Sequence, residues 1–140
     1  MRFWKYIFGL LSLIGVLVWV GVFNSADSRL HIIACDVGQG DAILVTLGNF
    51  QILTDGGPPN RRVLECLSSH MPFWDRNIEL VILTHPQLDH YGGFLDVFPR
   101  YKIENVMTIG LDSDSKEFEI FKNLVEEEGP KLISSVDSRI

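Results

Sequence analysis

Residues 84–90 read Thr-His-Pro-Gln-Leu-Asp-His, and the interpretation of the whole chain starts from them. They place two imidazoles and a carboxylate within six positions, directly after the apolar run 78–83. A buried strand that ends in such residues brings metal ligands to the rim of a sheet, and zinc takes ligands of these kinds. The alternative is a polar loop after a strand. The number of candidate ligands, followed by Gly92-Gly93, favours a metal site or its remnant.

The spacing of these residues is suited to two metal positions. His85 and Gln87 lie two positions apart, so on an extended strand their side chains would point the same way, and Pro86 keeps the chain extended before it. Asp89 and His90 follow at the expected first turn of a helix, where they can face a second position. Two metals about 3.5–4 Å apart can activate a water molecule and clamp both oxygens of a displacement.

Two further motifs come earlier in the chain. Residues 35–41 read C-D-V-G-Q-G-D between two strand-like runs, and residues 52–57 read I-L-T-D-G-G. Together with T-H-P-Q-L-D-H-Y-G-G, their order and spacing closely resemble the metallo-β-lactamase superfamily. The nearest resemblance is to the hydrolase-like domain of ComEC-type competence proteins, which take up DNA, and it covers about residues 30–110.

The resemblance implies roles for particular residues. His85 would ligate one metal, and Asp89 and His90 the other. Gln87 stands where the family has its second histidine, and its neutral amide oxygen makes it a weak ligand. Asp55 would orient the ligands by hydrogen bonding, and Asp55 and Asp89 are the candidate catalytic residues. The implied cofactors are two divalent metals, zinc or manganese, which we expect to be bound weakly or not at all by this chain.

Asp36 and Asp41, in the first motif, have two open interpretations. They match the family's D-V-G-Q-G-D signature, which would give them a part in the site. Alternatively, they are turn-forming carboxylates that accept hydrogen bonds from nearby backbone N–H groups.

The family's fold is an αβ/βα sandwich of two similar halves, and the resemblance implies that the remaining ligands come from the second half. Those ligands are a further histidine, a bridging aspartate and a last histidine. The four histidines of this chain end at His90, and no candidate ligand lies near the later aspartates in sequence, which are Asp96, Asp112, Asp114 and Asp137. We therefore expect an α/β fold that is half of the sandwich, in a truncated domain over residues 30–140. A truncated gene product, a fragment and a degenerate homologue would each have this appearance.

The N-terminus predicts a membrane anchor. Residues 6–23 contain no charge, follow Arg2 and Lys5, and are long enough to span a bilayer. The flanking positive charges favour an N-terminus inside and a domain outside the cytoplasm. We therefore expect an anchor and short linker over residues 1–29, with a single span at about 6–23 in the cell membrane. A cleaved signal peptide is the alternative, although residues 24–26 form a poor cleavage site.

The rest of the chain is acidic. After the apolar run, residues 24–140 carry ten basic and eighteen acidic side chains, a formal charge of −8. Such a surface repels a phosphate backbone unless metals or a basic patch compensate. The pair Arg61-Arg62 near the site is such a patch or simply the solvated start of a helix. Cys35 and Cys66 show no disulfide framework, so we expect buried or partly buried thiols.

Hydrophobic periodicity predicts an alternation of strands and helices in the second part of the chain, typical of a layered α/β sheet. The expected strands are 30–35, 42–47, 50–54, 78–84 and 103–109, with another beginning at Leu132-Ile133, and the expected helices are 61–70, 91–98 and 115–128.

Two classes of function are compatible with these features. The first is a ComEC-like, metal-dependent hydrolase, by resemblance a phosphodiesterase or nuclease with nucleic acid as its substrate. The second is a non-catalytic, membrane-anchored remnant or partner-binding module.

Overall fold

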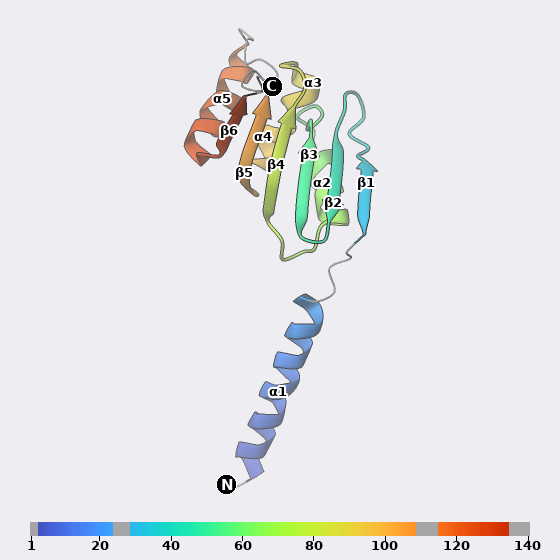
Figure 1. The fold of residues 1–140 in the computed structure, drawn as a ribbon, viewed down its shortest axis with the longest axis vertical. Helices are drawn as coiled ribbons and strands as arrows, with labels where there is room; N and C mark the ends of the chain where they lie inside the picture. The colour runs from blue at the N-terminus through green and yellow to red at the C-terminus, as the bar shows by residue number, and fades with distance from the viewer. Residues whose placement is uncertain (1–2, 24–28, 109–114, 135–140) are drawn as a thin grey trace, which may run out of the picture.

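A mixed sheet of six strands is the centre of the structure, a computed structural model that describes residues 3–23, 29–108 and 115–134 (Figure 1). The strands lie side by side in sequence order as β1 (Leu30–Ala34), β2 (Ile43–Leu47), β3 (Phe50–Thr54), β4 (Asn77–Leu83), β5 (Lys102–Thr108) and β6 (Lys131–Ser134). Antiparallel pairing joins β1, β2 and β3, and parallel pairing joins β3 to β6. The predicted α/β class and all six predicted strands are confirmed, except that residue 109 lies outside the described residues.

Helices connect the parallel strands. The structure has α2 (Arg62–His70) between β3 and β4, α3 (Leu88–Tyr91) and α4 (Phe94–Val97) between β4 and β5, and α5 (Lys116–Glu128) between β5 and β6. The Ser115 hydroxyl caps α5 by accepting a hydrogen bond from the Phe118 amide, and Gly129 ends the helix in the left-handed conformation.

The predicted single helix 91–98 is wrong, because two short helices replace it. The first begins earlier, at Leu88, and Gly92-Gly93 separates it from the second. At Gly93 a side chain would overlap the Gly56 carbonyl, so the loop after β3 and this helical segment are in backbone contact. Close backbone approach therefore explains the two glycines.

One face of the sheet carries the core. Leu44, Leu53, Val81 and Val106 lie in register across β2 to β5, and each is fully buried. Aromatic side chains from α3, α4, α5 and the segment after α4 pack over them in mutual ring contact, namely Tyr91, Phe94, Phe98, Phe118 and Phe121. Figure 1 shows α2 and α4 on this side of the strands.

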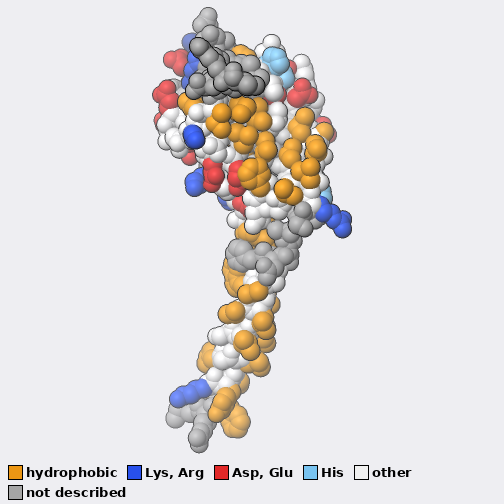
Figure 2. Space-filling view, in the orientation of Figure 1, with side chains coloured by type: hydrophobic (Ala, Val, Ile, Leu, Met, Phe, Trp, Pro, Cys, Tyr) orange, Lys and Arg blue, Asp and Glu red, His pale blue; other side chains and the backbone are white. Residues whose placement is uncertain are grey.

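The opposite face of the sheet is apolar and open. Ile32, Val45, Ile52 and Leu80 lie in register across β1 to β4, and Ile32 is 71% exposed. Figure 2 shows hydrophobic side chains gathered over the strands on this face. Among the described residues, the helices therefore cover one side of the sheet, and much of the other side is exposed.

The N-terminal helix α1 (Phe3–Phe23) stands apart from this domain (Figure 1). Residues Phe3–Gly21 are long and apolar enough to cross a membrane, with a mean hydropathy of 1.9 and no burial against the domain. A signal sequence near the N-terminus can also be this long and this apolar. The predicted apolar helix is confirmed, whereas its orientation in a membrane stays a prediction.

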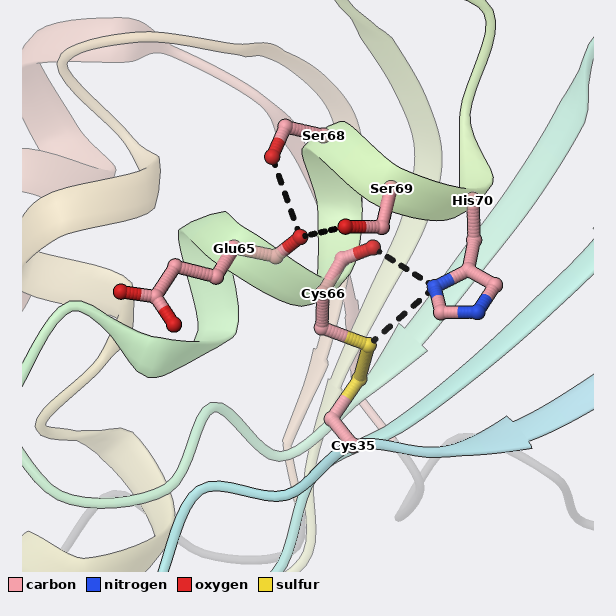
Figure 3. Close-up of a disulfide and its surroundings, with 6 residues drawn as sticks. All are labelled: Cys35, Glu65, Cys66, Ser68, Ser69 and His70. Atoms are coloured by element: carbon pink, nitrogen blue, oxygen red, sulfur yellow. Dashed lines mark hydrogen bonds between the residues drawn. A yellow bond between two sulfur atoms is a disulfide. The ribbon is translucent and has the colours of Figure 1, made fainter.

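Cys35 and Cys66 form a disulfide, so the prediction of two thiols is wrong (Figure 3). The bridge joins the loop after β1 to the middle of α2, with the Cα atoms 5.7 Å apart. Nδ1 of His70 forms a 2.9 Å hydrogen bond with the Cys66 carbonyl and lies 3.9 Å from its sulfur. Two cysteines 31 positions apart form no recognisable framework in sequence, and only the placement of α2 beside β1 brings them together.

Candidate metal centre

The candidate site lies where the adjacent strands β3 and β4 end. These strands run parallel, with Thr54 opposite Ile82, so the residues that follow them emerge at the same edge of the sheet. Asp55 directly follows β3, and Thr84 follows the end of β4. In α/β sheets this edge, outside the carboxyl ends of the strands, is where ligands bind.

Asp55 is the centre of the hydrogen-bond network at this edge. It is 3% exposed, and its carboxylate accepts hydrogen bonds from the Thr84 amide at 2.9 Å and the Thr84 hydroxyl at 2.6 Å. Its own amide donates to the Ile82 carbonyl at 2.8 Å. Asp55 adopts a left-handed backbone conformation, with φ of 55°, which aspartate tolerates better than most residues. The carboxylate is therefore fixed in place by both backbone and side-chain contacts.

His90, on α3, contacts the same carboxylate. Its Nδ1 lies 2.9 Å from the second Asp55 oxygen, and its side chain is 16% exposed. The hydrogen bond to Asp55 raises the pKa of His90 above the ordinary 6.5. Burial opposes this shift, and the negative charges of Asp55, Asp89 and Asp41 add to it. Because a carboxylate only accepts hydrogen bonds, Nδ1 carries the proton, and the lone pair of the neutral ring is on Nε2.

The same reasoning fixes the tautomer of His85. Its Nδ1 lies 3.0 Å from the Thr84 hydroxyl oxygen, whose own proton is donated to Asp55. His85 must therefore donate from Nδ1, which again leaves the lone pair of the neutral ring on Nε2. The ring centroids of His85 and His90 are 5.4 Å apart. One carboxylate thus orients two neighbouring imidazoles, one directly and one through a hydroxyl.

Gln87 and Asp89 are less closely connected to this network. Strand β4 ends at Leu83, so His85 and Gln87 lie in the loop beyond it rather than two apart on a strand. Gln87 is exposed, and its backbone carbonyl accepts hydrogen bonds from the amides of His90 and Tyr91 at the start of α3. Asp89 is partly buried, and its backbone carbonyl packs against Gly40, where a side chain would overlap it.

The structure brings together Asp55, Thr84, His85 and His90. Within residues 3–23, 29–108 and 115–134, however, no three His, Cys, Asp or Glu side chains converge closely enough to hold a metal ion. The donor chemistry is suited to zinc or manganese, since it offers two imidazole nitrogens and nearby carboxylates, but the set is partial.

The C-D-V-G-Q-G-D loop contacts the site from one side. The Asp41 carbonyl accepts a hydrogen bond from the Gly57 amide at 2.9 Å, and the Val37 carbonyl accepts one from Asn60 at 2.7 Å. Asp36 is exposed and lies 3.4 Å from Arg62, the first residue of α2. This loop therefore supports the segment after β3 through backbone contacts.

The remaining candidate residues lie away from the network or outside the described residues. Arg61 pairs with Asp96 at 3.5 Å, and Arg100 pairs with the same carboxylate at 3.6 Å. These are surface ion pairs beside α2 and α4, and Asp96 is thereby engaged as a partner of arginines. Asp112, Asp114 and Asp137 lie outside the described residues.

Sequence reasoning gave no role to Thr84, although it belongs to the first motif quoted. Its hydroxyl links Asp55 to His85, and its amide anchors the carboxylate. A threonine after a strand carries no signal of its own, because only the pairing of β3 with β4 places it beside Asp55.

The sequence matches the Metallo-beta-lactamase superfamily over residues 35–137. Among solved structures, the chain is similar to the metallo-beta-lactamase fold protein YhfI from Bacillus subtilis, with a TM-score of 0.50 and 20% identity. That alignment covers 75% of this chain and 44% of the B. subtilis chain. The likeness shows the fold alone, and this chain corresponds to less than half of the length of that protein.

Two other solved structures have lower scores. The Rm3 metallo-beta-lactamase has a TM-score of 0.41 and 24% identity, covering 48% of this chain and 25% of that one. A diphosphatase from the PhnP family has a TM-score of 0.39 and 18% identity, covering 67% and 36%. No curated protein matches the chain by sequence.

Proposed function

Because this chain belongs to the metallo-beta-lactamase superfamily, we propose that its domain is part of a metal-dependent hydrolase of the ComEC-like type, acting on phosphodiesters such as those of nucleic acid. One observation carries the proposal. The Asp55 carboxylate holds His90 directly and His85 through Thr84, which leaves both Nε2 atoms as ligating atoms. Carboxylates that orient metal-binding histidines in this way are the usual support of a metal site.

The proposed ligands are His85, Asp89 and His90, with Gln87 as a weak fourth. A divalent metal bound there supplies Lewis acidity and makes a water molecule more acidic. Asp55 acts through His90 and Thr84 by fixing tautomers and ring orientations. Asp89, next to His90, contributes negative charge that favours a cation at this edge of the sheet.

The proposal includes incomplete activity for these 140 residues. Three ligands and a weak fourth leave most coordination positions to water, and the described residues contain no converged triad of donors. We expect weak metal binding and little or no phosphodiesterase activity from this chain. The rest of the family's ligand set would have to come from a second half of the domain.

Elemental analysis of the purified chain, together with hydrolysis of a generic phosphodiester with and without manganese, tests this directly. Tightly bound, stoichiometric metal and steady turnover that disappears in His85→Ala would contradict the expected incompleteness. When the second half of the domain is supplied, His90→Ala should reduce activity more than Gln87→Ala. Equal losses would contradict the ligand assignment.

We also propose that α1 anchors the chain once in the cell membrane, with the N-terminus inside and the domain exported. The charges of Arg2 and Lys5, on the N-terminal side of the uncharged run 6–23, support this orientation. The Cys35–Cys66 disulfide supports it independently, because such bonds persist in oxidising compartments outside the cytoplasm. A C-terminal fusion to a reporter enzyme that works only after export should therefore be active, and an active cytoplasmic reporter in its place would refute the topology.

The second candidate is a non-catalytic, membrane-anchored module, and the partial donor set favours it. The coding sequence downstream of codon 140 discriminates between the two. Additional histidines and an aspartate in the family's order would support the hydrolase, and their absence would support the module.

A further inference from the structure

The direction of the strands decides which end of the domain lies nearest to α1. β1 and β3 both pair antiparallel with β2, and β3, β4 and β5 pair in parallel, so β1, β3, β4 and β5 all run the same way. The loops that enter β4 and β5 therefore lie at the end of the sheet where β1 begins, and Figure 1 shows the loop into β4 there. The candidate metal centre, which follows β3 and β4, lies at the opposite end.

A short connection keeps the start of β1 close to a membrane that α1 spans. The 21 residues of α1 give a helix about 31 Å long, which matches the hydrocarbon thickness of a bilayer. β1 begins at Leu30, seven positions after α1 ends at Phe23, so the two points are at most about 25 Å apart. The end of the sheet where β1 begins is therefore the end nearest to the lipid headgroups. This step rests on the single span proposed for α1.

Two neighbouring aromatic side chains lie in the loop into β4 at this end. The Phe73 side chain is 77% exposed, and its ring meets the Trp74 ring edge-on, with the centroids 4.8 Å apart. The loop precedes Asn77, the first residue of β4, so it lies beyond the strand end rather than on the open face of the sheet. Aromatic side chains with an apolar body and a polar tip, tryptophan above all, are enriched at the level of the lipid headgroups.

Contacts with neighbouring segments hold this loop in one shape. The Asp75 amide donates to the Pro72 carbonyl at 2.9 Å and closes a turn around the aromatic pair. The Asp75 carboxylate accepts hydrogen bonds from the Gln51 side chain at 3.3 Å and from the Asn77 amide at 3.0 Å. The aromatic pair is therefore held in place before any contact is made, which reduces the entropy lost on binding.

Exposed basic side chains flank the aromatic pair. The Arg76 guanidinium lies 5.1 Å from the centre of the Tyr101 ring and donates to the Tyr101 hydroxyl at 2.9 Å. The Arg76 carbonyl accepts a hydrogen bond at 2.7 Å from the amide of Lys102, which begins β5. The nearby acidic side chains each accept a hydrogen bond from an amide group, and they are Asp75, Glu79 and Glu104.

We propose that the loop 71–76 docks on the headgroup region of the membrane in which α1 is embedded. Phe73 and Trp74 insert between the headgroups, and Arg76 and Lys102 lie at the level of the lipid phosphates. Residues 24–140 have a formal charge of −8, so a zwitterionic surface fits this contact better than an anionic one. The covalent connection to α1 supplies a high effective concentration, so a small contact is sufficient. Docked in this way, the domain turns its candidate metal centre away from the membrane.

Tryptophan fluorescence of the full chain in phosphatidylcholine vesicles tests the docking, because Trp74 is one of three tryptophans and the other two lie in α1. Three single-tryptophan chains are compared, with phenylalanine at the other natural tryptophan positions. The first keeps Trp74, and the second keeps Trp19 of α1. The third carries Lys116→Trp, at the exposed start of α5 and at the opposite end of the sheet. Circular dichroism and the intact disulfide establish folding of each chain.

Lipids with brominated acyl chains quench a tryptophan that lies against them. We expect them to lower the emission of Trp19 and of Trp74 at least twofold and to leave that of the Lys116→Trp chain unchanged. Quenching of Trp19 alone overturns the docking and leaves the single span intact. An unquenched Trp19 overturns the span, and this inference with it. Quenching in all three chains overturns the docking of this end, because the domain then contacts the membrane without a preferred end.

A substitution in the loop tests whether the aromatic pair makes the contact. Phe73→Asp, introduced into the chain that keeps Trp74, should abolish the quenching of Trp74 by brominated lipid. Ile120→Asp on α5, where the side chain is 53% exposed, is the matched control and should leave that quenching unchanged. Quenching that persists in Phe73→Asp, or that Ile120→Asp abolishes equally, overturns the proposal.

Discussion

Replacement of Asp55 should separate the two contributions of this residue, which are its hydrogen bonds and its backbone conformation. Asp55→Ala removes the acceptor of three hydrogen bonds. The Thr84 amide and the His90 Nδ1 then lose their acceptor at a buried position, since Asp55 is 3% exposed. Alanine is also less tolerant than aspartate of φ near 55°. Asp55→Asn keeps one carbonyl acceptor and a side chain suited to the left-handed conformation.

The structure gives the size of each effect. Loss of hydrogen bonds to a buried charged group costs about 1.5–3 kcal/mol each, less than additively, and the left-handed conformation adds about 1 kcal/mol for alanine. We expect Asp55→Ala to lower the free energy of unfolding by about 4–6 kcal/mol and Asp55→Asn by about 1–2 kcal/mol. The first loss is a large fraction of the stability of a domain this size.

The cost of Asp55→Asn should also depend on pH. The hydrogen bond to Asp55 raises the folded-state pKa of His90 above 6.5, so its stabilising contribution is complete below pH 6.5. That contribution disappears as the pH rises through the folded-state pKa. The difference between wild type and Asp55→Asn should therefore be larger at pH 5.5 than at pH 8.

Urea unfolding of the full chain in mild detergent, followed by circular dichroism, measures these differences. Hydrogen–deuterium exchange of the Thr84 amide measures the local bond. Asp36→Ala is the matched control, because that side chain is 93% exposed, and it should change neither. The reasoning is refuted if Asp55→Ala and Asp55→Asn lower the free energy of unfolding equally, or if the loss in Asp55→Asn does not vary with pH. Unchanged hydrogen exchange of the Thr84 amide in Asp55→Ala would also refute it.

Two further perturbations test the support of the site. Gly40→Ala should lower the free energy of unfolding by about 3–5 kcal/mol and displace Asp89, because φ at this position is 91° and the new Cβ would overlap the Asp89 carbonyl. Gly48 has φ of 62° and open space around it, so Gly48→Ala should lower that free energy by about 1 kcal/mol. Thermal unfolding of both variants decides this, and equal losses would contradict the packing. Reduction of the Cys35–Cys66 bridge, which closes a loop of about 31 residues, should lower stability by about 3–4 kcal/mol. The double variant Cys35→Ser, Cys66→Ser should show the same loss of stability without reductant, and reductant should not change its stability further. If reductant leaves the stability of the wild-type chain unchanged, the bridge is not formed.

Local sequence patterns were sufficient to predict the sheet and the proximity of Asp55, His85 and His90, whereas their role as a metal site stays a prediction. Apolar runs of strand length, broken by glycine and proline, predict each strand because those signals act within a few residues. His85, His90 and Asp55 lie together as expected, since β3 and β4 end at the same edge. The metallo-β-lactamase family was also recognisable from three short motifs, whereas the ComEC-like specificity stays a proposal.

The features that could not be predicted depend on contacts between segments distant in sequence. The disulfide requires α2 to lie beside the end of β1, and the division of the helix at Gly92-Gly93 requires Gly56 to be near. Thr84 acquires its role only when β4 pairs with β3. In each case the deciding partner lies 28 or more positions away, beyond the reach of periodicity or propensity.

The disulfide also divides the chain in the order of its synthesis. Cys35 and Cys66 both precede the start of β4 at Asn77, and the loop they close contains β2 and β3. If the exported part crosses the membrane in sequence order, starting next to α1, both cysteines and both antiparallel pairings emerge before β4, β5 and β6. The antiparallel pairings join neighbouring segments and form quickly, whereas β4 must find β3 across the α2 crossover. If the disulfide forms at that stage, the strands assemble in the order in which they emerge. The first half is then covalently closed and serves as the template to which β4, β5 and β6 are added in turn.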